Sequence, residues 1–146
     1  MTPTAPELLG GCVVALATPP RPEEMGPFMA GTVGVAALLD MLAAQECATG
    51  AATRVWENAA LRALLTEAAG AYDAKLDGAL ASAGKVGDGD YSLAALDTAN
   101  AELRRRLIRL HEAVEAAIDT GLDRRILALY RDMAARRELQ LPPMPG

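Results

Sequence analysis

The sequence predicts an all-α protein, folded as an antiparallel bundle of four to five helices. Among its 146 residues, 31 are Ala and 21 are Leu, whereas Val, Ile and Thr together number only 19. Ala and Leu favour helices, and the β-branched residues that favour strands are scarce. With 51% hydrophobic and 23% charged residues, the chain has enough apolar surface to form a core. We therefore expect a single helical domain over residues 1–146 and no sandwich, barrel or βαβ unit.

The first expected element is a short helix over residues 4–18. Thr4 can cap this helix, Pro6 falls in its first turn, and Glu7 stands at the third helical position, as in a capping box. The Pro-rich sequence that follows ends the helix as a stiff connector. Residues 1–22 thus form an N-terminal helix and connector, and residues 140–146 form a tail at the other end.

A very apolar helix is expected at about 27–48, where Asp40 and Glu46 are the only charged residues. Its part Phe28–Leu39 is apolar or small on every side. A helix without a polar face is normally buried all round, in a core or in an oligomer. Because so small a chain covers such a helix with difficulty, we predict a homo-oligomer. Strong solvent exposure of this part in an isolated subunit, or a strand there, would count against the prediction.

Gly50 is expected to break the chain before a long helix over about 52–82. The apolar residues of that helix follow i, i+3, i+4, i+7 spacing. They are Leu61, Leu64, Leu65, Ala68, Tyr72, Leu76, Ala79 and Leu80. Gly70 is a position at which this helix can bend or end. Residues 83–91, rich in Gly and Asp, form a loop.

The clearest pattern belongs to a helix expected at about 92–119, which Ser92 or Asp90 can cap. Spacings of three and four alternate over nearly four heptads, which is typical of a seam between helices. The seam residues are Leu93, Leu96, Asn100, Leu103, Leu107, Leu110, Val114 and Ala117. Asn100 is the polar member, and we expect it to be hydrogen-bonded in the core and to fix the register.

The last helix is expected to begin at Thr120, because the sequence Thr120–Asp123 has the form of a capping box. Its apolar stripe comprises Leu122, Ile126, Leu129, Tyr130 and Met133. Five arginines occupy its other faces. The pattern completes an antiparallel bundle.

Composition also limits the partners. The net charge of −5 is opposite in sign to that of a typical nucleic-acid binder, so we expect no nucleic acid. The longest uncharged runs are shorter than the roughly 18–20 residues of a spanning helix, so no membrane span is expected. No secretion signal is recognised, and a cytoplasmic protein is predicted. Cys12 and Cys47 do not make a disulfide framework, and both are expected to be buried.

No coherent catalytic set is found. His111 is the one histidine, and it shows no zinc-ligand spacing with Cys12 or Cys47. Ile108 stands where a di-iron bundle would have the Glu of Glu-x-x-His. We expect His111 to pair with Glu115, one helical turn away. We therefore predict no catalytic residue and no cofactor, and we favour a non-enzyme.

Asp88 and Asp90 are the candidate metal ligands. Two carboxylates on a glycine loop could hold Mg²⁺ or Ca²⁺, although the rest of the calcium-loop pattern is missing. This Gly-Asp-Gly-Asp sequence resembles that of the all-helical nucleotide-binding subunit of dihydroxyacetone kinases, which implies phosphoryl transfer. That family continues with His-Gly, whereas Tyr91 and Ser92 follow here. The alternative is a solvated turn with an N-cap carboxylate.

Candidate surfaces for a ligand or partner lie on two helices. The apolar helix offers Phe28, Met29, Gly34, Leu38 and Met41. The seam helix offers a basic patch of Arg104, Arg105, Arg106 and Arg109. With a cleft, that patch would suit a phosphate or coenzyme A; without one, it is a solvated helix face. Trp56, with Arg54, Glu57 and Asn58, marks another candidate surface site, or else a packing anchor.

Five features can be matched to a known family: Pro3–Leu9, Phe28–Gln45, Asp88–Asp90, Leu93–Leu103 and Leu129–Leu139. Their order resembles a small family of uncharacterised bacterial all-helical proteins. Members are often encoded beside aminoglycoside-phosphotransferase-like kinases and acyl-CoA dehydrogenase-like proteins. The resemblance implies an accessory role near acyl-CoA metabolism, with no assigned catalytic residues. This chain departs from the family in an insertion around 46–82 and in a less charged second helix.

Three functions remain open. The leading hypothesis is a non-enzymatic helical bundle that self-associates or docks to a partner enzyme. The second is a small-ligand or acyl-chain pocket among the Met and Leu residues of 25–42, with Cys47 nearby. The third is a Mg²⁺-dependent phosphoryl-transfer enzyme that uses Asp88 and Asp90.

Overall fold

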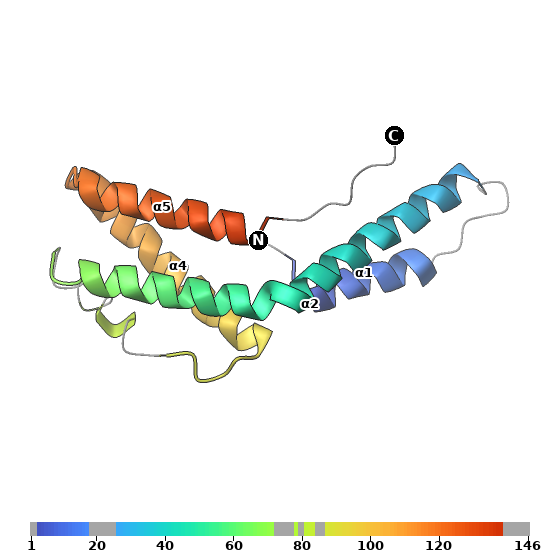
Figure 1. Ribbon diagram of the computed structural model, residues 1–146, viewed down its shortest axis with the longest axis horizontal. Coiled ribbons are helices and arrows are strands. Elements are labelled where there is room, and N and C mark those ends of the chain that lie inside the picture. The colour runs from blue at the N-terminus through green and yellow to red at the C-terminus, as the bar shows by residue number, and fades with distance from the viewer. Residues whose placement is uncertain (1–2, 18–25, 72–77, 79–80, 84–86, 139–146) are drawn as a thin grey trace. The chain divides into compact units, whose positions relative to one another are not determined.

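The computed structural model describes residues 3–17, 26–71, 78, 81–83 and 87–138. Its main helices are α1 (Ala5–Ala17), α2 (Pro27–Ala68), α4 (Leu93–Ala116) and α5 (Thr120–Arg136) (Figure 1). No strand occurs in these ranges, and the predicted all-α helical bundle is confirmed. The chain forms two compact units, the first reaching Gly50 and the second spanning Ala51–Glu138. That the two units make one domain stays a prediction.

In the first unit, α1 begins as its capping pattern predicts. Glu7 Oε2 accepts hydrogen bonds from the backbone N–H of Thr4 at 2.7 Å and from its hydroxyl at 2.9 Å. α1 then packs on α2, where the buried Cys12 thiol donates to Ala36 O and to Asp40 Oδ1. The expected connector after this helix and the expected tail at 140–146 lie outside the described residues. Cys47 is exposed, so its expected burial is wrong.

The apolar part of α2 is not shielded within one chain. Ala36 and Ala43 are buried, and α1 lies alongside this part of α2 (Figure 1). The exposed fractions of Met29, Val33, Val35 and Leu38 are 41%, 56%, 52% and 44%. The expectation that this helix is covered on all sides is therefore wrong for the single chain, because one neighbouring helix covers only one strip of it. The homo-oligomer prediction assumed that this part of the helix is buried, and its exposure in the single chain counts against that reasoning.

Gly50 does not break the chain. α2 continues through it for 42 residues in all, from Pro27 to Ala68. A glycine inside a helix costs only about 1 kcal/mol relative to Ala, and Ala51 and Ala52 follow it directly. The helix ends instead near Gly70, whose φ of +95° is the left-handed conformation that terminates helices. The helix expected over 52–82 thus stops at Ala68, and the end of its predicted stripe lies outside the described residues.

In the second unit, α4 follows its predicted seam. Ser92 is the N-cap, and its hydroxyl accepts a hydrogen bond from Ala95 N. The buried residues of α4 are Leu96, Asn100, Leu103, Leu107, Leu110 and Val114. Six of the eight seam positions are therefore buried, which confirms the seam.

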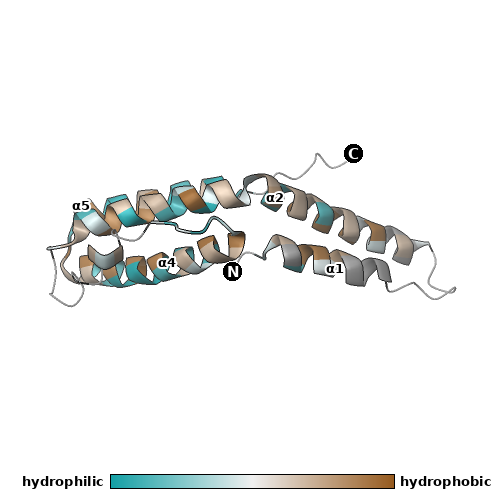
Figure 2. Ribbon diagram, turned by 90° about the horizontal axis from the view of Figure 1, so that it is seen from below, coloured by the Kyte–Doolittle hydropathy of each residue, from teal (hydrophilic) through white to brown (hydrophobic). Residues whose placement is uncertain are grey.

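The cap of α5 differs from the expectation by one residue. Asp119, not Thr120, is the N-cap, and its Oδ1 accepts from the N–H groups of Gly121 and Leu122. The predicted stripe is confirmed, since Ile126, Leu129 and Met133 are buried. These three side chains pack with the α4 leucines and with Leu61, Leu64, Leu65 and Ala68 of α2. Figure 2 shows the alternation of polar and apolar faces along α4 and α5.

Candidate functional site

One part of the interior of the second unit consists of polar side chains, whereas the rest consists mainly of leucines. Arg54, Glu57 and Asn58 of α2 are 2%, 0% and 0% exposed, and Asn100 of α4 is 5% exposed. The expected surface site at Arg54, Glu57 and Asn58 is therefore wrong. They lie seven, four and three positions before Leu61, so they continue the inward-facing stripe of α2. That periodicity was the signal in the sequence that could have placed them inside.

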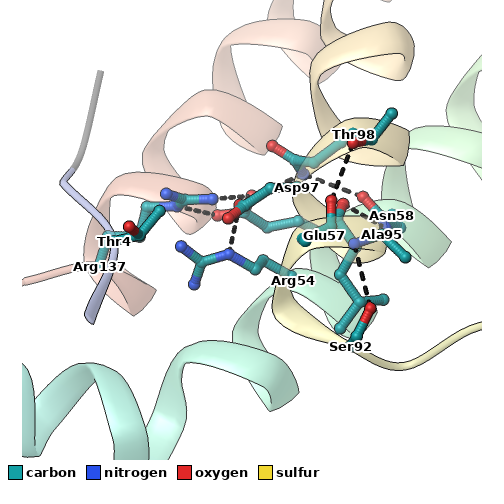
Figure 3. Close-up of polar contacts among 12 residues, drawn as sticks. Thr4, Arg54, Glu57, Asn58, Ser92, Ala95, Asp97, Thr98 and Arg137 are labelled. Carbon is teal, nitrogen blue, oxygen red and sulfur yellow. Dashed lines mark hydrogen bonds and ion pairs between the residues drawn. The ribbon is translucent and has the colours of Figure 1, made fainter. Parts of the chain in front are cut away.

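Glu57 lies at the centre of this buried cluster (Figure 3). Its Oε1 accepts from Arg137 Nε at 2.6 Å, and its Oε2 accepts from Arg137 Nη2 at 2.8 Å. The same Oε2 accepts from Asn100 Nδ2 at 2.9 Å and from Arg104 Nη2 at 3.2 Å. One carboxylate thus connects α2, α4 and the residue that follows α5.

The amides of Asn58 and Asn100 complete the cluster. Asn100 Nδ2 also donates to Asn58 Oδ1 at 3.0 Å, and Asn58 Nδ2 donates to Leu96 O at 3.3 Å. This confirms the expectation that Asn100 is hydrogen-bonded in the core. At the edge of the cluster, Arg54 Nε donates to Asp97 Oδ1 at 2.5 Å.

The charge of Glu57 is set by two opposing influences. Burial, the largest single one, raises the pKa of Glu57, but the hydrogen bonds and charges of Arg137 and Arg104 together outweigh it. The net result is a pKa below the ordinary value of 4.5, so Glu57 is ionised at neutral pH. A carboxylate with four donors and a lowered pKa is a structural anion, because a general base needs a free acceptor and a pKa near the working pH.

The predicted metal ligands are also engaged. Asp88 Oδ1 accepts from Arg62 Nη2 at 2.6 Å and from Asn58 Nδ2 at 3.2 Å. The hydrogen bond from Arg62 is the main cause that lowers the pKa of Asp88, in spite of burial. Asp90 is exposed, and its Oδ1 accepts from Ser92 N at 2.8 Å.

Asp88 therefore links the glycine loop to α2 through its bonds to Arg62 and Asn58. Asp90 binds the backbone N–H of Ser92, just before α4 begins. Within the part of the chain that the structure describes, three or more His, Cys, Asp or Glu side chains nowhere gather as ligands for a metal ion. This arrangement favours the N-cap turn over the phosphoryl-transfer site.

The basic patch is not a single site. Arg104 reaches the buried cluster, whereas Arg105 is exposed and pairs with Glu102. Arg109 is exposed as well. Since consecutive helical residues point in different directions, adjacent arginines do not converge on one ligand.

His111 and Trp56 have structural roles. His111 Nε2 lies 2.9 Å from Asp123 Oδ1 and 3.8 Å from Glu115 Oε1, so the expected pair with Glu115 is joined by a closer one. The guanidinium carbon of Arg136 lies 3.9 Å from the centre of the Trp56 ring, a cation–π contact that fits the packing-anchor interpretation.

A cavity of about 370 Å³ opens between α4 and α5. Its lining residues are Arg104 and Ile108 of α4, with Tyr130, Met133, Ala134 and Arg137 on the other side. Two of the cations that bind Glu57 therefore also face this cavity. Sequence reasoning missed the cavity, because its lining comes from residues far apart along two helices.

Comparisons of this chain with protein-family models, with curated proteins and with solved structures gave no match. None of the helices described here combines the length and the apolar character that crossing a membrane would require. Fold and site together define an all-α bundle in whose second unit a buried ion-pair cluster links α2, α4 and the residue after α5.

Proposed function

We propose that this is a non-enzymatic helical-bundle protein that acts by association, through the exposed apolar face of the first part of α2. One observation carries the proposal: the neighbouring side chains of Val35 and Leu38 are 52% and 44% exposed. The helical period places Val35 and Leu38 on the same side of α2 as Gly31 and Gly34, whereas Met29 and Val33 lie on another side. Large apolar patches on a protein surface commonly mark interaction sites. Association would remove this exposed apolar surface from water, so the reason for a partner is the exposure of the face and not its burial within one chain.

A second copy of the chain is the occupant that this face favours. Gly31 and Gly34 are exposed, and a Cβ added at either position would have nothing within 4 Å. Without side chains at these positions, another helix can approach the backbone closely. In a two-fold dimer, the same patch serves both subunits.

A partner enzyme is the alternative occupant. The resemblance to proteins encoded beside acyl-CoA dehydrogenase-like proteins supports an accessory role in acyl-CoA metabolism, and a bacterial, cytoplasmic protein belongs to the same proposal. Of the other residues predicted for this surface, Gly34 is exposed and Met41 is half-buried. The side chain of Phe28 lies outside what the structure describes.

Sedimentation velocity at micromolar concentration tests the proposal. We expect wild type to sediment as a dimer or larger, and Leu38→Glu to sediment as a monomer because it places a charge in the contact. The matched control is Leu127→Glu, because Leu127 of α5 is 46% exposed and lies outside the patch. A monomeric wild type would refute self-association, and equal effects of the two variants would refute the assigned face.

A further inference from the structure

We propose that the cavity between α4 and α5 binds a small carboxylate that carries an apolar tail. Arg104 pairs with the carboxylate, and the tail lies against Ile108, Tyr130 and Met133. This site is separate from the α2 face, so the proposal does not depend on self-association.

The size and lining of the cavity suit such a ligand. Its volume of about 370 Å³ lies at the lower end of the roughly 300–1,000 Å³ that is typical of ligand pockets. Met133 is 4% exposed and lines the cavity with a flexible side chain that adapts to different shapes. Ile108 is 53% exposed, so a tail that covers it would remove apolar surface from water.

Arg104 supplies the charge that selects an anionic head. Its side chain is 41% exposed and donates to Glu57 through Nη2 at 3.2 Å. Arg137 holds the same carboxylate by two shorter bonds, so Glu57 compensates the charge of Arg104 only in part. The Nε of Arg104 is buried and makes no hydrogen bond to any described residue.

The geometry also distinguishes between classes of ligand. Arginine presents parallel N–H donors that match the two oxygens of a carboxylate. Inorganic phosphate would leave the apolar lining uncovered. A primary amine would meet two guanidinium groups of its own sign. An alcohol carries no charge, so it would not compensate the part of the Arg104 charge that Glu57 leaves over.

Isothermal titration of the full chain with octanoate tests the proposal, with octan-1-ol, octylamine and inorganic phosphate as comparison ligands. We expect saturable binding of octanoate, and binding of each comparison ligand that is at least tenfold weaker. Ala134→Leu fills the cavity and should weaken octanoate binding at least tenfold. Ala135→Leu is its matched control, because Ala135 is exposed and does not line the cavity.

A second pair of variants tests the head group. Arg104→Gln should weaken octanoate binding at least tenfold, whereas Arg105→Gln, the same change on the next residue, should leave it unchanged. Since Arg104→Gln also loses a bond to Glu57, circular dichroism checks its fold, and the Ala134 pair stands independently. The proposal is overturned if octanoate does not bind at millimolar concentration, if octanol binds equally well, or if the Ala134 and Ala135 variants behave alike.

Discussion

Replacing Glu57 with Gln tests whether the buried cluster stabilises the fold. The side chain keeps its size but loses its charge, so Arg137 and Arg104 lose their shared anion. Removing one partner of a buried ion pair costs roughly 3–5 kcal/mol. The side chains of Arg137 and Arg104 are 21% and 41% exposed and can regain water. We therefore expect the free energy of unfolding to fall by about 3 kcal/mol, at the lower end of that range.

The same cluster makes stability depend on pH in a defined direction. The folded pKa of Glu57 lies below the ordinary value of 4.5 that applies to the unfolded chain. Below that value the unfolded state binds more protons than the folded state. The stabilisation from Glu57 is therefore complete above about pH 4.5 and is lost as the pH falls through the folded pKa. The difference between wild type and Glu57→Gln should shrink in acid accordingly.

Urea unfolding followed by far-UV circular dichroism measures both effects. Glu67→Gln is the matched control, since it is the same substitution on the same helix. Glu67 pairs with Arg125 on the surface, where the two side chains are 61% and 49% exposed. We expect this control to leave the unfolding midpoint unchanged. A loss below about 1 kcal/mol for Glu57→Gln would refute the argument, because that is the value of an exposed pair.

Two further substitutions test the glycine loop and the α4–α5 turn. Asp88→Asn removes the anion that binds Arg62 and should lower the free energy of unfolding by about 1–2 kcal/mol at neutral pH. Arg62 holds the pKa of Asp88 below its ordinary value of 3.8, so the difference in stability should disappear only as the pH falls below about 3.8. Urea titrations that show no difference between the two proteins at neutral pH would contradict this prediction. Ile118 is 81% exposed and has a φ of +55°, which is strained for a β-branched residue. Ile118→Gly should therefore raise the free energy of unfolding by about 0.5–1 kcal/mol, and a lower value would show that the turn is not strained.

The helices of the second unit could be predicted because their patterns allow one inward face. Along α4, alternating spacings of three and four place Leu96, Leu103 and Leu110 on one side of the helix, and these leucines are buried. Break positions were harder to predict. Gly50 and Gly70 are both glycines, but of the two only Gly70 adopts a positive φ. The residues around each glycine decide whether the helix continues.

The partners within the buried cluster could not be predicted from local sequence. Charged residues normally lie in water, so Glu57 beside Trp56 suggested a surface. Its main partner, Arg137, is 80 positions away in the chain. A period within α2 can show that Glu57 faces inward, but no pattern within one helix shows which cation meets it there. The same limit hid the cavity, whose lining combines Arg104 with Met133.

The two cysteines differ in their accessibility to reagents. Cys12 is buried, and its hydrogen bond to Asp40, together with burial and the charge of Asp40, raises the pKa of the thiol. The thiolate is the nucleophile that attacks thiol reagents, so Cys12 should react slowly at neutral pH. Cys47 is exposed on the apolar half of α2. A maleimide dye would therefore label the natural sequence at a single defined position, without any engineered cysteine.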